Sequence, residues 1–503
     1  MTVLMQSGWP FYEDEWLGVS LDLRHMGVTE AQIQEAAPLI ERALAAMVDL
    51  EGGALANPSE ARMVGHYWLR DSALAPDDAI TASIDEARRA VQDLSAHFGA
   101  FKTIFHVGIG GSALGPRLLI DALSASERQI RFLDNIDPDG IAEIIDAHRL
   151  DEVGIVVVSK SGTTAETMGA LVELEEALAL EDLTLADRTL AITCEGSALA
   201  ERAEQEGWLG VLPLWDWVGG RTSMMSAVGL FPATLAEVDG EGILEGAARM
   251  DEWTRTESLE DNPALGMALA WYAATEGQAK RSQVILPYAD RLSLLAPFLQ
   301  QLIMESLGKA EDLDGAPVHQ GLTVYGNKGA TDQHAYVQQL REGPDDHFTT
   351  FVELRDISDC EAGDTLSALL AGTRSALHEV GRRTTTLSFD RFDEVQFGAL
   401  IALFERAVGF YATFVNINAY DQPGVEAGKR CAGAVLALQD ALLTLLSEGA
   451  EGDARELAEQ LSADPELVFH VLRRLASNDL VATDGVGLER TFSDASNIPG
   501  LIY

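Results

Sequence analysis

The stretch Lys102-Thr103-Ile104-Phe105-His106-Val107 runs directly into Gly108-Ile109-Gly110-Gly111-Ser112-Ala113-Leu114-Gly115-Pro116. The first part predicts a strand and the second a glycine-rich loop that opens a helix. The loop fits the loose dinucleotide fingerprint Gly-x-Gly-x-x-Ala, in which backbone N–H groups approach an anion. Taken alone, it fits a generic tight turn equally well. Asp134, which follows the next strand, leaves an NAD site possible for this stretch.

The same order of strand, loop and helix recurs along the chain. It predicts an α/β protein with two doubly wound parallel sheets, each covered by helices on both faces. In such sheets, ligands bind beyond the carboxyl ends of the strands. The strands are expected at residues 102–107, 130–133, 154–158 and 189–193, and then at 283–287, 322–325 and 349–354.

A second loop, after the strand at 154–158, is rich in hydroxyl groups. A terminal phosphate offers three acceptor oxygens and negative charge, which suits such a loop at a helix start. Helix capping alone would explain one or two of these hydroxyls, but hardly four. The candidate substrate-binding residues here are Ser159, Lys160, Ser161, Gly162, Thr163, Thr164 and Thr167.

Two further stretches carry groups suited to proton transfer. Arg221 follows Gly219-Gly220, and its guanidinium could stabilise an oxyanion or form a structural ion pair. Glu305 lies in an otherwise apolar helix, and the i, i+4 spacing puts Gln301 on the same face. A carboxylate in a partly dry pocket is a candidate general base, whereas a solvated helix position is the plainer interpretation.

Two basic residues complete the set of candidates. His334 lies in a polar loop and could open a sugar ring by proton transfer, or could simply cap a helix. Lys429 follows Gly424-Val425-Glu426-Ala427-Gly428, where an ammonium could serve a ring oxygen or a phosphate. Lysine is scarce, since the chain has only Lys102, Lys160, Lys280, Lys309, Lys328 and Lys429.

Together these stretches resemble the glucose-6-phosphate isomerase (phosphoglucose isomerase) family, which is built from two sugar-isomerase (SIS) domains. The resemblance covers about residues 100 to 440, and it is specific because the motifs occur in the family's order. The motifs are GIGGSALGP (108–116), SKSGTTAET (159–167), WDWVGGRTS (215–223), QQLIMESLGK (300–309), GATDQHAYVQQL (329–340) and GVEAGK (424–429).

The resemblance implies a role for each candidate in interconverting glucose 6-phosphate and fructose 6-phosphate through a cis-enediolate, without a metal or organic cofactor. Gly111, Ser112 and Gln301 would contact substrate, and residues 159–164 would hold the 6-phosphate. Glu305 would move the proton between C2 and C1, while Arg221 would steady the enediolate. His334 and Lys429 would assist ring opening, and in this family the histidine comes from the neighbouring subunit, which implies a homodimer.

The order of the expected helices and strands also suggests a division of the chain. We expect a mainly helical N-terminal segment at 1–95, a first SIS domain at 96–240 and a second SIS domain with linking helices at 241–447. A small winged-helix-like tail is expected at 448–503, from the order of two helices and a short strand.

Composition excludes several other classes of protein. The formal charge of −45 repels nucleic acid and anionic membranes. No secretory signal or long uninterrupted apolar run is apparent, so a cytoplasmic location is expected. The three cysteines are far apart and lack metal-binding spacing.

Three rival functions remain at this point. A sugar-phosphate-sensing transcription regulator pairs an SIS domain with a helix-turn-helix, but the tail is acidic and we expect no DNA binding. An isomerase that also accepts mannose 6-phosphate would differ only in the pocket around C2. An NAD enzyme is raised by the first glycine loop alone.

Overall fold

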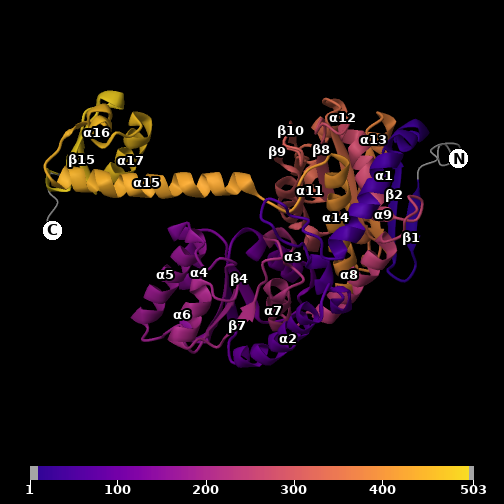
Figure 1. The fold of residues 1–503 in the computed structure, drawn as a ribbon, viewed down its shortest axis with the longest axis horizontal. Helices are drawn as coiled ribbons and strands as arrows, with labels where there is room; N and C mark the ends of the chain where they lie inside the picture. The colour runs from indigo at the N-terminus through magenta and orange to yellow at the C-terminus, as the bar shows by residue number, and fades with distance from the viewer. Residues whose placement is uncertain (1–9, 498–503) are drawn as a thin grey trace. The chain divides into compact units, whose positions relative to one another are not determined.

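The computed structural model describes residues 10–497, except for the side chains of Glu426 and Lys429. The chain forms two compact units, Met1–Asp421 and Gln422–Tyr503 (Figure 1). Both α/β sheets lie in the first unit. The second unit begins at residue 422, so the boundary expected at 447/448 is too late by the length of one helix.

The first sheet is entirely parallel and has the strand order β4-β3-β5-β6-β7. Alternate strand residues face two separate cores, as the period of two in a strand requires. This is the doubly wound arrangement that the sequence predicts. Its strands are β3 (Thr103–Val107), β4 (Gln129–Leu133), β5 (Val153–Val158), β6 (Thr189–Thr193) and β7 (Gly210–Pro213).

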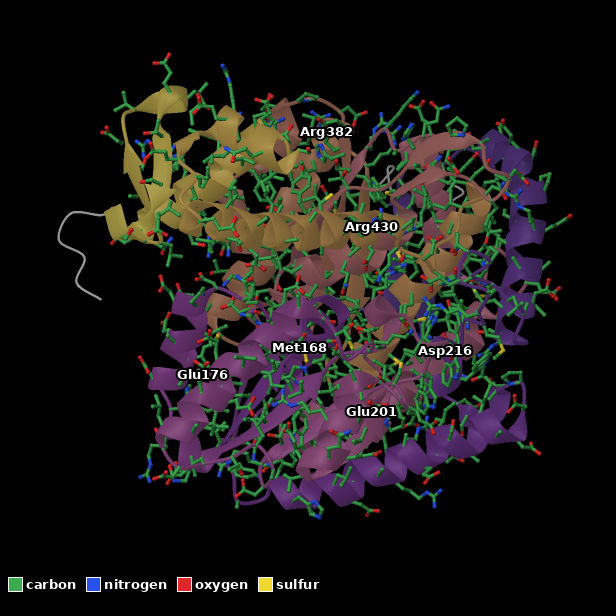
Figure 2. The ribbon with its side chains drawn as sticks, turned by 60° about the vertical axis from the view of Figure 1, so that its left-hand side comes forward. Met168, Glu176, Glu201, Asp216, Arg382 and Arg430 are labelled. Carbon is green, nitrogen blue, oxygen red and sulfur yellow. The ribbon has the colours of Figure 1, made fainter. Side chains whose placement is uncertain are left out.

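Helices cover both faces of this sheet. Figure 2 shows one outer surface, where α5 and α6 carry exposed carboxylates such as Glu176 and Glu201. The helices of this domain are α2 (Asp78–Ser95), α3 (Leu114–Leu123), α4 (Pro138–Asp146), α5 (Ala165–Leu180), α6 (Ala198–Glu206) and α7 (Ala227–Leu235).

The second sheet has the order β1-β2-β13-β12-β8-β11, in which β13, β12, β8 and β11 run parallel. The antiparallel hairpin β1-β2 extends it through β13. The strands are β1 (Phe11–Asp14), β2 (Val19–His25), β8 (Ser282–Pro287), β11 (Val324–Tyr325), β12 (His347–Leu354) and β13 (Thr384–Phe389).

The expectation of a mainly helical N-terminal segment is wrong over residues 11–25. Val19, Leu21 and Leu23 are buried, and they alternate with Ser20 and Asp22, so this stretch has the period of a strand. The helical expectation holds from Thr29, whose side chain caps α1 (Glu30–Glu51) in a capping box with Gln32.

The remaining helices of the first unit pack on and beside the second sheet. Figure 1 shows α14 alongside α8 in the interior of this unit. These helices are α8 (Gly240–Thr254), α9 (Pro263–Thr275), α10 (Leu295–Leu299), α11 (Gly329–Gln333), α12 (Val337–Glu342), α13 (Glu361–Glu379) and α14 (Glu394–Phe414), and a small hairpin joins β9 (Lys309–Glu311) to β10 (Pro317–Gln320).

The C-terminal unit has its own hydrophobic core, which includes Leu442, Leu457, Leu472 and Phe492. Its order of two short helices followed by a β-hairpin agrees with the winged-helix-like tail expected from the sequence. The elements are α15 (Pro423–Ser447), β14 (Gly452–Asp453), α16 (Ala454–Leu461), α17 (Pro465–Ser477), β15 (Val481–Asp484) and β16 (Thr491–Asp494).

Among the described residues, two helices, α14 and α15, are long and apolar enough to cross a bilayer by length and composition alone. α14 is 94% buried within the first unit, which is the environment of a core helix in a globular domain. The end of α15 packs into the core of the C-terminal unit through Leu442 and Leu446.

A network of buried charges joins the helices of the first unit. Arg70 donates to Asp251 at 2.5 Å and also pairs with Glu405. Arg406 lies 3.3 Å from the same Asp251 oxygen and pairs with Glu51. The Arg70, Arg406 and Asp251 side chains are at most 1% exposed. Each charge is therefore held by its partners rather than by water.

We predict that Asp251→Ala destabilises the fold by about 3–5 kcal/mol, because it leaves two buried guanidinium groups short of a partner. Thermal unfolding followed by circular dichroism measures the change. The control is Glu252→Ala, at the next position of α8, where the carboxylate is 68% exposed and pairs with Arg249. Equal effects of the two substitutions would contradict the buried network.

Candidate active site

Two loops meet at the carboxyl edge of the first sheet. β3 and β5 are parallel neighbours, with Val107 opposite Val157. The turn Gly110–Ser112 follows β3, and residues 159–164 follow β5 before α5 begins. The two loops that the sequence singles out therefore lie side by side.

The hydroxyl-rich loop is folded by its own side chains. The Ser159 hydroxyl accepts from the Gly162 N–H at 3.1 Å and lies 3.0 Å from the Thr164 hydroxyl. Gly162 has a φ of +69°, and a Cβ there would lie 2.6 Å from the Leu199 nitrogen, so the turn needs glycine. Ser161 and Thr163 remain exposed at its rim.

Lys160 connects this loop to the stretch that carries Arg221. Its ammonium donates to the carbonyl oxygens of Asp216 and Val218, both at 2.8 Å. Burial lowers the pKa of Lys160 to about 8, and the nearby Arg62 contributes in the same direction. Two of the three ammonium protons thus fix the Trp215–Arg221 stretch.

The glycine loop and the Arg221 turn are in close contact. A Cβ on Gly111 would lie 2.2 Å from the carbonyl carbon and oxygen of Gly220 and 2.9 Å from the Arg221 nitrogen. The Ser223 hydroxyl lies within donating distance of two carbonyls, that of Gly220 in its own turn at 2.7 Å and that of Gly111 across the junction at 3.4 Å. Glycine at position 111 therefore lets the two turns approach each other.

Glu305 lies at the end of a π-helix, Gln300–Glu305, that continues from α10. Such irregular turns are frequent at functional sites. The Glu305 carboxylate lies 3.0 Å from the Arg221 guanidinium, and the two side chains are 19% and 6% exposed. On the same π-helix, the Gln301 amide nitrogen lies 3.2 Å from the position that a Cβ on Gly110 would take. The helix that the sequence predicts around Glu305 ends before Lys309, which begins β9.

Backbone carbonyls from a distant part of the chain hold Arg221. Its Nη2 donates to the carbonyl of Ala419 at 2.9 Å and to that of Asp421 at 2.8 Å. Sequence reasoning misses these two residues, because a main-chain acceptor leaves no mark on residue type.

His106 is a further residue that sequence reasoning misses. Its Nε2 donates to the Ser112 carbonyl at 2.7 Å. Burial lowers the pKa of His106 to about 4, so its ring is neutral.

The chain matches the phosphoglucose isomerase family over residues 41–375 and 370–444. It is 46% identical to glucose-6-phosphate isomerase from Synechococcus sp. (strain JA-3-3Ab), over 93% of each chain. It is 45% identical to the chloroplastic glucose-6-phosphate isomerase 1 of Arabidopsis thaliana, over 96% of this chain and 84% of the relative. A crystal structure of a glucose-6-phosphate isomerase from Chlamydia trachomatis aligns with a TM-score of 0.78 at 27% identity, over 86% of this chain and 90% of that one.

The chain belongs to the phosphoglucose isomerase family.

Two of the predicted residues, His334 and Thr167, lie in surroundings that differ from those of an open binding loop, and a third, Lys429, is described only in its backbone. His334 ends α11 and is exposed. Thr167 is buried in the first turn of α5, so its hydroxyl does not face an open loop. Lys429 falls on α15, and its side chain lies outside the described part of the chain.

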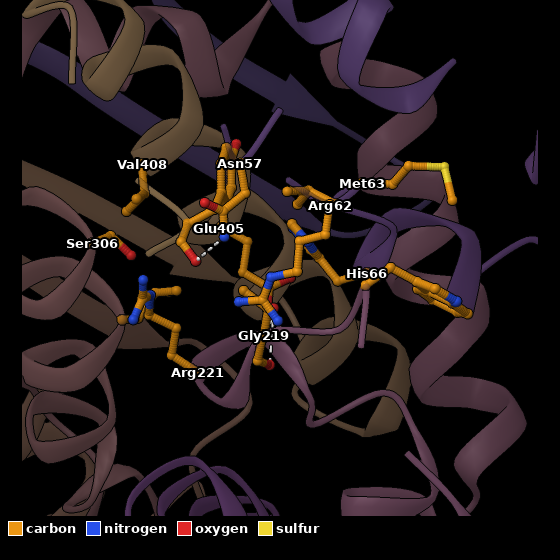
Figure 3. Close-up of a pocket in the computed structure, with 14 residues that line it drawn as sticks. Asn57, Arg62, Met63, His66, Gly219, Arg221, Ser306, Glu405 and Val408 are labelled. Carbon is orange, nitrogen blue, oxygen red and sulfur yellow. Dashed lines mark hydrogen bonds between the residues drawn. The ribbon is translucent and has the colours of Figure 1, made fainter. Parts of the chain in front are cut away.

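A cavity beside Arg221 is lined by His66, Gly219, Ser306 and Glu405 (Figure 3). Its volume is about 20 Å³, which holds a water molecule but no sugar. The cavity as it stands is therefore too small for a sugar phosphate.

We predict that Gly111→Ala lowers the turnover number by about 10²-fold, because the methyl group displaces the turn that positions Arg221. It should also cost about 1–3 kcal/mol of stability through overpacking. The control is Gly220→Ala, since no atom lies within 4 Å of a Cβ at that position. Steady-state kinetics and thermal unfolding measure both effects, and a harmless Gly111→Ala would contradict the described contact.

Proposed function

We propose that this protein interconverts glucose 6-phosphate and fructose 6-phosphate. The observation that carries the proposal is the Arg221–Glu305 pair, which lies beside the glycine loop. A carboxylate base next to a guanidinium is the arrangement that an enediolate reaction requires. Family membership and the names of the relatives support the same reaction.

In the proposed mechanism, Glu305 removes the proton from C2 of the open-chain aldose. The C–H electrons form the C1=C2 double bond, and the carbonyl oxygen at C1 becomes the enediolate oxygen. Arg221 stabilises that negative charge, since its guanidinium is already fixed by two carbonyls and does not have to reorganise. Glu305 returns the proton to C1, the hydroxyl proton moves from O2 to O1, and the ketose results.

The phosphate end of the sugar is assigned to residues 159–164. Thr164 precedes α5 without capping it through its side chain, so the first N–H groups of the helix are available to an anion. Its hydroxyl lies 3.0 Å from that of Ser159, and this contact uses only one of the two hydroxyl protons, so the other can be donated to the anion. Ser161 and Thr163 supply further donors at the rim. We assign Gly111, Ser112 and Gln301 to the sugar itself, and Lys160 to shaping the loop around it.

Ring opening is assigned to His334 together with Lys429. His334 is exposed in the first unit, and this is compatible with its serving the site of a second subunit in a homodimer. The proposed location is the cytoplasm, in agreement with the acidic composition.

We predict that Glu305→Gln lowers the turnover number by about 10³-fold or more, because the amide cannot accept the C2 proton. Binding of inorganic phosphate should remain close to that of the unmodified protein. A matched control is Glu311→Gln, an exposed carboxylate on β9. Loss of deuterium from C2-labelled glucose 6-phosphate measures the proton transfer directly. Retained exchange in Glu305→Gln would show that another group is the base.

If His334 serves the site of the second subunit, two inactive variants should complement each other in a mixed dimer. Glu305→Gln and His334→Ala, unfolded together and refolded, should regain about a quarter of the activity, because each hybrid dimer holds one intact site. Each variant refolded alone remains inactive. If the mixture also remains inactive, while native mass spectrometry shows that hybrid dimers form, His334 serves the site of its own subunit.

A further inference from the structure

Lys309 is a buried ammonium group that the proposed reaction does not use. It begins β9, shortly after Glu305, and its side chain is 5% exposed. Burying a charge costs free energy unless the charge is paired and hydrogen-bonded. The contacts of Lys309 therefore indicate which part of the structure the buried charge stabilises.

The ammonium has three protons and three acceptors within reach. It donates to the main-chain carbonyls of Glu305 and Ser306, both at 2.8 Å, and lies 3.6 Å from an Asp421 carboxylate oxygen. The last carbonyls of a helix have no intrahelical N–H partner. Lys309 supplies that partner to the π-helix at the residue that carries the base.

Asp421 closes the contacts into a ring. Its carboxylate accepts from the Ser59 hydroxyl at 2.7 Å, and its main-chain carbonyl accepts from Arg221 at 2.8 Å. Arg221 in turn pairs with the Glu305 carboxylate at 3.0 Å. The main chain and the side chain of Glu305 are thus held by the same small group of residues, and all of them lie in the first compact unit.

We propose that Lys309 is a positioning residue for the isomerase reaction, which fixes the main chain of Glu305 and, through Asp421, keeps Arg221 in register with it. The inference rests on the proposed role of Glu305 as the base. The last carbonyls of a helix need partners outside it, and the two carbonyls that Lys309 binds are at the end of the π-helix. A misplacement of about 1 Å in a reacting group can cost about 10²-fold in rate.

The charge of Lys309 depends on pH within an accessible range. Burial and Arg221 lower its pKa to about 8, while Asp421 and Glu305 act in the opposite direction. The ammonium is therefore present below about pH 8 and is lost as the pH rises through that value. An arginine in its place stays charged throughout. The pKa of Lys160 is also about 8, so the alkaline limb of the turnover number reports on Lys309 once Lys160 has been replaced by arginine.

The test compares Lys309→Met, Lys309→Arg, Glu305→Gln and Lys280→Met in the full-length protein. Lys280 is a matched control, because its ammonium is 51% exposed and pairs with the exposed Glu276. Lys309→Met should lower the turnover number by about 10²-fold while the Michaelis constant changes by less than about threefold. Lys309→Arg should keep about a tenth or more of the turnover number of the unmodified protein, because arginine retains the positive charge. Lys280→Met should behave as the unmodified protein does.

The outcomes distinguish a failure of the proposed isomerase function from a failure of the positioning role of Lys309. An unmodified protein without isomerase activity would overturn the proposed function. An active Glu305→Gln would overturn the role of Glu305 as the base, and with it the role of Lys309. If Glu305→Gln is inactive but Lys309→Met retains more than half of the turnover number, Lys309 does not position the base. If Lys309→Met fails to fold, the pH profile decides. Both profiles are measured in a Lys160→Arg background, because the pKa of Lys160 is also about 8. An alkaline limb near pH 8 that moves upward when Lys309→Arg is added supports the proposal, and an unmoved limb overturns it.

Discussion

The contact of 3.0 Å between the Arg221 guanidinium and the Glu305 carboxylate constrains the architecture of the first unit. Arg221 follows the last strand of the first sheet, whereas Glu305 follows the first parallel strand of the second. Neither sheet by itself holds both charges. Two doubly wound domains must therefore pack as one unit, and the buried network around Asp251 helps to join the helices that make this possible.

The local backbone is as important as the charges. Gly111 permits two turns to touch, Gly162 permits a left-handed turn, and the π-helix at 300–305 changes the direction of the chain before β9. These are departures from regular structure, and they cluster where two loops meet at a sheet edge. Such departures are stable only where surrounding contacts hold them, and here the contacts include Lys160, His106 and main-chain carbonyls.

The sequence predicts the parallel strands and the motif loops well, because buried strands and glycine-rich turns leave a clear local pattern. It fails for residues 11–25, where a short hairpin precedes a long helix and its alternation of Val19, Leu21 and Leu23 is brief. It also misses the anchors of Arg221. Asp421 is separated from Arg221 by 200 residues and acts partly through its main chain, which no local pattern reveals.

The first compact unit ends at Asp421, and the C-terminal unit begins at the next residue. The final residue of the first unit is thus one of the groups that hold Arg221. For protein engineering, this sets a limit on chimaeras and truncations. A junction placed after residue 421 retains both carbonyl anchors, whereas a junction only three residues earlier removes them along with the appended module.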